Sequence, residues 1–260
     1  MLIPDSDRVR AQFAKTAQAY VTSESHAKGE ELASMVELAG PLEGRAVLDV
    51  ATGAGHTAFA FARAGARVTA TDLTPQMLRT AQAVADERGI DNVTFRWARA
   101  EALPFAEDTF DVVTCRIAAH HFEQPTSFLS EVARVLRSNG LLIFVDNIAP
   151  VNRELASAVN TIERWRDPSH VRAYSVVDWV AWLAEVSLEL SYMTRFYRRK
   201  SFQSWLDVAQ TPNKERWLLE RHILELPPAV RDYLQVEVVA ERLETLSHEV
   251  VLLVARRLVT

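Results

Sequence analysis

The fold is decided by one stretch of sequence, Val47-Leu48-Asp49-Val50-Ala51-Thr52-Gly53-Ala54-Gly55-His56. An apolar run ends in a loop with two glycines, and a helical pattern begins at His56. Glycine permits positive φ and lets a ligand approach the backbone closely. In sheets of parallel strands, such a turn lies at the crevice where ligands bind. The stretch therefore predicts a strand, a ligand-binding turn and a helix.

Strand and helix patterns alternate around this turn, from residue 45 to residue 146. Apolar runs predict strands at 46–51, 67–71, 93–97, 110–115 and 141–145. Helical patterns fill the spaces between them at 56–64, 75–88 and 125–136. Continuous apolar strands are expected where helices cover both faces of a sheet. The alternation predicts an α/β fold with a doubly wound parallel sheet.

The two flanking regions follow other patterns. An apolar stripe predicts an N-terminal helix, carried by Val9, Phe13, Ala17 and Tyr20, and a second helix is expected at 26–38. Five of the six tryptophans follow Pro150, in segments rich in Arg and Glu, and strand patterns return at 188–197 and 249–255. We expect residues 150–245 to form helices around closing strands, as a cap that closes about a hinge near Pro150.

Composition excludes several classes of protein. The formal net charge is -5 and no Lys/Arg block stands out, so no nucleic-acid partner is expected. The single cysteine, Cys115, excludes an internal disulfide and a thiolate cluster. No apolar run approaches the roughly 18 residues of a membrane helix, and the first residues lack a signal-peptide core. We expect a reduced, cytoplasmic protein; the sequence predicts no oligomeric state.

Asp72 follows the second predicted strand. A carboxylate there can accept hydrogen bonds from both hydroxyls of a ribose, so turn and aspartate together predict an adenosine-containing cofactor. The turn also fits the G-x-G-x-x-G/A pattern of NAD proteins. A plain strand–helix turn, with Asp72 capping the next helix, is the structural alternative.

Two further features bear on whether the adenosine-containing cofactor is NAD or another molecule. Asp49 lies within the end of the first strand, and Ala100-Glu101-Ala102-Leu103-Pro104-Phe105 follows the third. With Thr114-Cys115-Arg116-Ile117-Ala118-Ala119-His120-His121-Phe122, this arrangement resembles the class I S-adenosylmethionine (SAM)-dependent methyltransferases, especially the ubiquinone/menaquinone C-methyltransferase branch and its bacterial relatives. The resemblance covers about residues 10–175. An NAD(P)-dependent oxidoreductase remains an alternative, although no Tyr-x-x-x-Lys is present, as does a non-catalytic SAM-binding module.

The resemblance implies a Rossmann-like, seven-stranded, mostly parallel sheet. Its strand order would be 3-2-1-4-5-7-6, with residues 249–255 as the antiparallel seventh strand and a helical cap. Residues 1–40 would cover the cofactor, 41–150 would bind SAM, and 151–260 would supply the cap and the closing strands. The three parts would form one structural domain.

The resemblance also implies cofactor contacts. Asp49 would support the loop and the methionine amine, and Asp72 would bind the ribose hydroxyls. Ala51, Gly53 and Gly55 would pass beneath the methionine and ribose. The other expected contacts are Leu73 and Met77 on the adenine face, the Ala100 N–H and Glu101 at the adenine edge, Arg116 and Ile117 beside the methionine, and Tyr20 with Ser25 and His26 closing over the cofactor.

Arg99 departs from the family pattern. Many relatives carry Asp there, to accept from the adenine amine, whereas Arg has donors only. That contact must be lost or replaced. We expect the long Arg99 side chain to swing toward solvent, so that water bridges to the adenine; stacking on the adenine face, or pairing with Glu101 or Asp72, is the alternative.

Methyl transfer requires mainly alignment and the exclusion of water. A general base is needed only when the acceptor arrives protonated. His120 and His121 after the fourth strand, and His170 in a turn after Asp167-Pro168, are candidates for that base or for positioning a small-molecule acceptor; a structural role is the alternative. The side chains of the adjacent His120 and His121 are expected to diverge, so no metal site is predicted.

A cationic run follows later in the chain, at Arg195, Arg198, Arg199 and Lys200. It is interpreted as a solvated face, or as a surface that attracts an anionic substrate.

Overall fold

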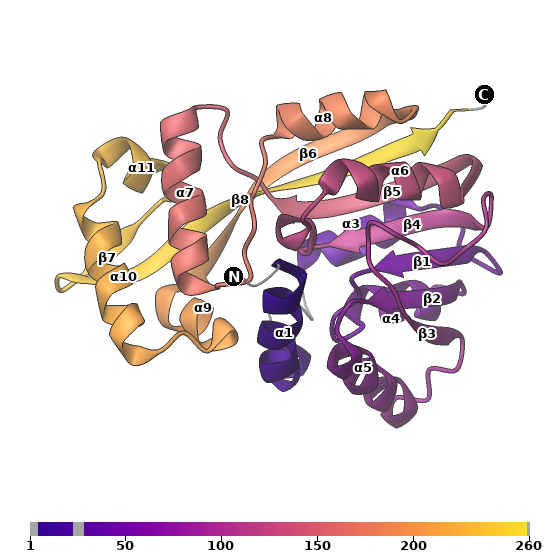
Figure 1. The fold of residues 1–260 in the computed structure, drawn as a ribbon, viewed down its shortest axis with the longest axis horizontal. Helices are drawn as coiled ribbons and strands as arrows, with labels where there is room; N and C mark the ends of the chain where they lie inside the picture. Colours follow the sequence, from indigo (N-terminus) through magenta and orange to yellow (C-terminus); the bar gives the residue numbers. More distant parts are fainter. Residues whose placement is uncertain (1–4, 23–28, 259–260) are drawn as a thin grey trace.

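A computed structural model describes residues 5–22 and 29–258 of the chain (Figure 1). Its sheet runs in the order β3-β2-β1-β4-β5-β8-β6, and a short strand, β7, pairs with β8 off this path. The strands are β1 (Ala46–Val50), β2 (Arg67–Asp72), β3 (Val93–Trp97), β4 (Phe110–Arg116), β5 (Leu136–Asn147), β6 (Leu188–Ser201), β7 (Glu237–Val239) and β8 (Arg242–Arg257).

The strand directions confirm the fold expected from the sequence. β1 to β5 are parallel, and β8 runs antiparallel to both of its neighbours, β5 and β6. The observed strand order matches the expected order except for one strand number. The short hairpin strand β7 precedes the last strand in the chain, so the strand that was expected to be the seventh is labelled β8.

Helices cover both faces of the sheet. Adjacent residues of a strand point to opposite faces, so Leu48 packs on one side and Val47 on the other. The Leu48 side is covered by α6 (Pro125–Val135) and α8 (Val176–Glu185), and the Val47 side by α3 (Glu30–Leu38), α4 (His56–Arg63) and α5 (Pro75–Glu87). Burial of each large apolar side chain contributes about 1.5–3 kcal/mol.

A smaller lobe lies beyond the sheet, at the left of Figure 1. It has its own apolar cluster, built around Phe202, Trp205 and Leu206. Its helices are α7 (Arg153–Arg166), α9 (Phe202–Ala209), α10 (Asn213–Glu225) and α11 (Pro228–Tyr233). β6 and β8 extend from the sheet into this lobe and still pair at Lys200 and Leu246. Two strands therefore connect the lobe to the sheet, in addition to the chain segment at Pro150 where a hinge was expected.

Helix α1 (Asp5–Thr22) lies between the lobe and the sheet (Figure 1). Val9 and Ala17 of its predicted apolar stripe are buried. The Gln12 side-chain amide donates a hydrogen bond of 2.7 Å to the Ala209 carbonyl of α9. None of the helices in the described part of the chain is both long and apolar enough to cross a bilayer.

Candidate functional site

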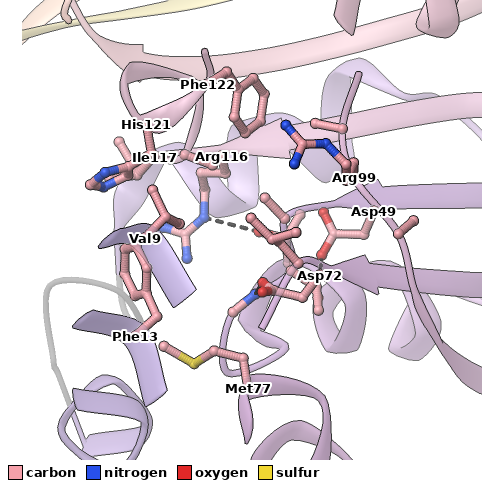
Figure 2. A pocket seen from close by; sticks show the side chains of 18 of the residues that line it. Val9, Phe13, Asp49, Asp72, Met77, Arg99, Arg116, Ile117, His121 and Phe122 are labelled. Atoms are coloured by element: carbon pink, nitrogen blue, oxygen red, sulfur yellow. Dashed lines mark hydrogen bonds between the residues drawn. The ribbon is translucent and has the colours of Figure 1, made fainter. Parts of the chain in front are cut away.

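A pocket opens at the carboxyl ends of β1, β2 and β4, with α1 forming its opposite wall (Figure 2). It contains about 980 Å³ of space between atoms, its open mouth included. Asp49 and Asp72 approach from the strands, and Val9 and Phe13 from α1. This is the crevice in which sheets of this kind bind ligands.

The glycine turn forms the floor of the pocket. The φ angles of Ala51, Gly53 and Gly55 are 55°, 55° and 89°. A Cβ added at Gly53 would meet nothing within 4 Å, so this residue faces open space. A Cβ at Gly55 would lie 2.4 Å from the Phe59 ring. Gly55 is therefore required for helix packing at the start of α4, and it does not line the pocket as Ala51 and Gly53 do.

Asp72, at the end of β2, forms hydrogen bonds that hold the glycine turn in place. Its Oδ2 accepts from the Gly53 N–H at 2.9 Å, and its Oδ1 accepts from the Thr74 N–H at 2.7 Å. Burial raises the pKa of this carboxyl to about 6, although both N–H groups oppose the shift. Each oxygen retains a second lone pair. Asp72 thus organises the local backbone and borders the pocket at the same time.

Asp49 supports the turn from inside β1. Its two oxygens accept from the Thr52 hydroxyl at 2.6 Å and from the Thr114 hydroxyl at 2.7 Å. Burial raises the pKa of Asp49 to about 6, and the hydroxyls and Arg116 reduce the shift. The Thr52 contact connects Asp49 to the loop, which is the supporting position expected from the sequence.

Residues after β2 and β3 line one end of the pocket, where Leu73, Met77, Ala100 and Glu101 all lie as expected. Arg99 adopts the paired alternative, with Glu101 as one partner, and not the favoured swing toward solvent. Instead of extending freely into solvent, its Nη2 lies 3.4 Å from Glu123 Oε2 and its Nε lies 3.9 Å from Glu101 Oε2. Both carboxylates line the pocket, so hydrogen-bond acceptors are present beside Arg99.

Arg116 and Ile117 line the other end. Arg116 donates to the Thr57 hydroxyl at 3.0 Å and to Glu31 at 2.9 Å, and Glu31 also pairs with Arg198. Ile117 has φ 56°, which is unfavourable for a β-branched residue. Such strain is common at ligand sites, where the surrounding structure fixes the backbone.

The three candidate histidines gather behind this end of the pocket. The ring centroids of His120 and His121 are 4.2 Å apart, and those of His120 and His170 are 5.4 Å apart. The expected divergence of the adjacent rings is therefore wrong. The His120 carbonyl accepts from the N–H groups of Val171 and Arg172, which docks the His170 loop on this turn. Only His121 lines the pocket itself, with Phe13 packed edge-on against it.

The histidines differ in their polar partners. His120 Nδ1 lies 2.6 Å from Asp146 Oδ1, and the His120 N–H donates to Asp146 Oδ2 at 2.9 Å. Burial alone would lower the pKa of His120, but the Asp146 carboxylate reverses the effect and the pKa is raised. Burial and the neighbouring His120 lower the pKa of His121 to about 4 and that of His170 to about 2. His121 and His170 are therefore neutral at pH 7.

Some site residues were missed, and others lie outside the described part. Val9 and Phe13 line the pocket but were assigned only to a helical stripe, and Glu123 was not singled out. The Tyr20 side chain, Ser25 and His26 lie outside the described residues. Across residues 5–22 and 29–258, no group of three or more His, Cys, Asp or Glu is arranged to hold a metal ion.

Comparison with known proteins assigns the family. A family profile described as a methyltransferase domain matches residues 48–144. The uncharacterized methyltransferase YcgJ of Bacillus subtilis is 36% identical over 220 residues, covering 85% of this chain and 87% of YcgJ. The chain belongs to the class I SAM-dependent methyltransferases.

Solved structures agree with this assignment. A crystal structure of a putative methyltransferase from Bacillus halodurans has a TM-score of 0.85 and 37% identity, covering 89% of this chain and 100% of that one. The crystal structure of YcgJ has the same TM-score with 32% identity, covering 88% and 98%. This methyltransferase is thus an enzyme with SAM as its cofactor, and the oxidoreductase alternative is wrong.

Proposed function

We propose that this methyltransferase acts on a small molecule whose attacking atom carries a proton, and that His120 removes the proton. The observation that carries the proposal is the His120–Asp146 pair, buried directly behind the pocket residue His121. A carboxylate bound to Nδ1 orients an imidazole and stabilises its protonated form.

The pocket fits SAM. Gly53 leaves open space above the turn, and the Asp72 carboxylate beside it can accept from the ribose hydroxyls. Leu73 and Met77 offer an apolar surface to the adenine, and Glu101 offers the acceptor that position 99 lacks. When bound, SAM supplies a methyl carbon already activated by its sulfonium.

The enclosure of the site favours a small acceptor. Val9 and Phe13 cover the pocket from α1, and the Ser169 carbonyl accepts from His121 Nδ1 at 2.9 Å, which closes the wall behind it. A nucleic acid would require an open, basic approach, whereas the net charge is -5. The resemblance to quinone C-methyltransferases makes hydroquinones reasonable candidates, beside phenols and amines.

The role of each residue follows from its contacts. Asp146 fixes His120 through two hydrogen bonds, so Nδ1 carries the proton and Nε2 is the basic nitrogen. In the part of the chain that the structure describes, no hydrogen bond reaches this Nε2, so it is free to accept a proton; the ring lies behind His121, which is the histidine of the three that lines the pocket. The acceptor's proton passes to Nε2, and Asp146 stabilises the resulting imidazolium.

A transfer screen with radiolabelled SAM tests the acceptor class. Phenols, hydroquinones and amines are compared with total RNA and with denatured protein. We expect label in the small-molecule fraction; transfer confined to RNA or protein would contradict the proposal.

The same assay tests His120. His120→Gln and Asp146→Asn should lower kcat by about 10²-fold or more, while the SAM dissociation constant stays near that of the wild type. The matched control is His222→Gln on α10, a histidine that packs against Trp165 away from the pocket. In the wild type, kcat should rise with pH through the raised pKa of His120. An unchanged kcat and pH profile in both site variants would exclude His120 as the base.

A further inference from the structure

Glu123 lies between the turn that follows β4 and helix α6, at the edge of the cofactor pocket. Its side chain is 28% exposed, and each of its two oxygens has a partner. Oε1 accepts from the Ser6 N–H at 2.5 Å, and Oε2 lies 3.4 Å from Arg99 Nη2. One carboxylate therefore joins the start of α1, 117 positions away in the sequence, to the residues that follow β3.

The contact with Ser6 is a helix cap that comes from a distant part of the chain. Ser6 is the second residue of α1, and the first N–H groups of a helix have no acceptor within the helix. A carboxylate is a strong acceptor for such a group, and its charge also interacts favourably with the helix dipole. Glu123 therefore stabilises the first turn of α1 in the position where this helix forms the wall of the pocket.

Helix α1 depends on such polar contacts, because it buries few apolar side chains. Among residues 6–17, the buried side chains are those of Val9, Thr16 and Ala17. Ser6, Val9 and Phe13 line the pocket, and their spacing of three and four residues places them on one face of the helix. Phe13 packs edge-on against His121, with ring centroids 5.0 Å apart. The segment from His121 to Glu123 therefore contacts this face at both of its ends.

Arg99 and Glu101 hold Glu123 from the other side. Arg99 pairs with Glu123 Oε2, and the Glu123 N–H donates to Glu101 Oε1 at 3.2 Å. All three side chains line the pocket at the end where we place the adenine. Because Arg99 already orders the carboxylate, its contact with Ser6 costs little additional side-chain entropy.

Direct contact with the cofactor is the alternative role for Glu123. The exocyclic amine of adenine could donate to a carboxylate oxygen at this end of the pocket. Both Glu123 oxygens already have close partners, whereas the contact found for Glu101 Oε2 in the described part of the chain is the 3.9 Å approach of Arg99 Nε. Glu101 is therefore the better acceptor for the amine, and Glu123 is the better support for α1.

We propose that Glu123 is a positioning residue, which holds the first turn of α1 over the adenine end of the pocket and so slows release of the cofactor. Figure 2 shows Val9 and Phe13 of α1 facing the residues at the strand ends, so a cofactor bound between them is released past this helix. The inference rests on the proposed placement of SAM in the pocket, and it does not depend on the identity of the methyl acceptor.

The rate of S-adenosylhomocysteine release, measured by stopped-flow displacement, tests this role. Glu123→Ala should release the ligand about tenfold faster than the wild type, and amide hydrogen exchange in the first turns of α1 should quicken in the complex. Glu123→Gln keeps an uncharged acceptor oxygen for the Ser6 N–H, so its release should be only about threefold faster.

Glu220→Ala is the matched control. Glu220 also accepts a backbone N–H, from Leu243 at 3.1 Å, and its Oε1 lies 2.7 Å from Arg242 Nε. It belongs to α10 in the lobe and does not line the cofactor pocket. Its release rate and the exchange of α1 should match those of the wild type.

S-inosylhomocysteine separates the two roles of Glu123. This analogue carries a ring carbonyl where S-adenosylhomocysteine carries the adenine amine, so it has no amine to donate. A positioning role predicts that Glu123→Ala weakens the binding of both ligands by the same factor, within about twofold. A direct contact with the amine predicts that only S-adenosylhomocysteine binds more weakly, with no change in the exchange of α1.

Three results would overturn the inference: wild-type release from folded Glu123→Ala, faster release without faster exchange in α1, or a loss of affinity confined to S-adenosylhomocysteine. If Glu123→Ala does not fold, Glu123→Gln is judged in its place, and a wild-type release rate in that variant overturns the inference equally. Each of these results leaves the cofactor placement intact, because that placement is tested separately through Asp72. The small-molecule transfer screen tests the proposed acceptor independently of both.

Discussion

Replacing Asp72 with asparagine should separate cofactor binding from folding. Asp72→Asn keeps the shape of the side chain and one acceptor oxygen, while the second position becomes an NH₂ group. That group will face the N–H of either Gly53 or Thr74, because Asp72 accepts from both. The same change removes an acceptor from the ribose hydroxyls of SAM.

The effect on folding should be small. The pKa of Asp72 rises from 3.8 to about 6, so the fold disfavours its charged form by about 3 kcal/mol relative to the neutral form. The asparagine is uncharged, so the variant avoids the cost of burying a charge. It leaves one backbone N–H without an acceptor, which costs about 1–3 kcal/mol. The two terms offset each other. SAM affinity should instead fall by about 10- to 150-fold, the equivalent of one charge-assisted hydrogen bond of about 1.5–3 kcal/mol.

The wild type should show a matching pH dependence. A raised carboxyl pKa means that the stability contributed by Asp72 is fully present below pH 3.8 and is lost as the pH rises through about 6. Cofactor binding has the opposite sign, because the ribose hydroxyls stabilise the ionised form. SAM affinity should therefore weaken as the pH falls below about 6. Asp49, with a similar pKa, remains in the variant, so the slope should be reduced but not abolished.

Calorimetric titration of SAM between pH 5 and 8, at about unit steps, measures both effects. The control is Asp111→Asn, an aspartate whose carboxylate also accepts a backbone N–H, from Ala46, but which does not line the pocket. Its SAM affinity should match the wild type. A folded Asp72→Asn protein with wild-type affinity would refute the cofactor placement.

Three further predictions concern the turn, the adenine end and α1. Gly55→Ala should lower the free energy of unfolding by about 2–4 kcal/mol in urea titrations, because φ is 89° and the new Cβ meets the buried Phe59 ring; wild-type stability would contradict this. Arg99→Asp should weaken SAM binding about three- to tenfold at low salt, because three carboxylates then meet; tighter binding would mean that an acceptor at position 99 is what the site lacks. S-adenosylhomocysteine should slow amide hydrogen exchange in α1 and leave α10 unchanged; equal protection in both helices would argue against α1 as the cover.

Local sequence rules predicted the centre of the sheet well. β3 has the bounds expected from its apolar run, and the neighbouring strands and helices differ by one or two residues at most ends. β5 is the exception. It begins at Leu136, directly after α6, because the segment pairs with β4 before the apolar run starts. Pairing across a sheet is not visible in a single segment.

The lobe was predicted less completely. The sequence predicted helices in this region, but it did not predict that β6 continues through the whole cationic run to Ser201. There, alternate residues face opposite sides, so Arg198 reaches Glu31 of α3, and Arg199 reaches Glu237 of β7. In the sequence, the cationic run suggests a single solvent-exposed face. In the structure, successive residues of the strand point to opposite sides, so the run is divided between two environments.

The sequence by itself determined the strand–turn–helix unit, the two aspartates at the strand ends and the cofactor they imply, because hydrophobic period and turn chemistry act between near neighbours. Tertiary structure decided which polar groups meet. It paired Arg99 with Glu123, brought His170 to His120 across 50 positions of sequence, and joined Glu163 of α7 to His248 of β8. These contacts depend on how the lobe docks on the sheet. That docking is set by the burial of apolar surface from distant segments, and no local pattern encodes it.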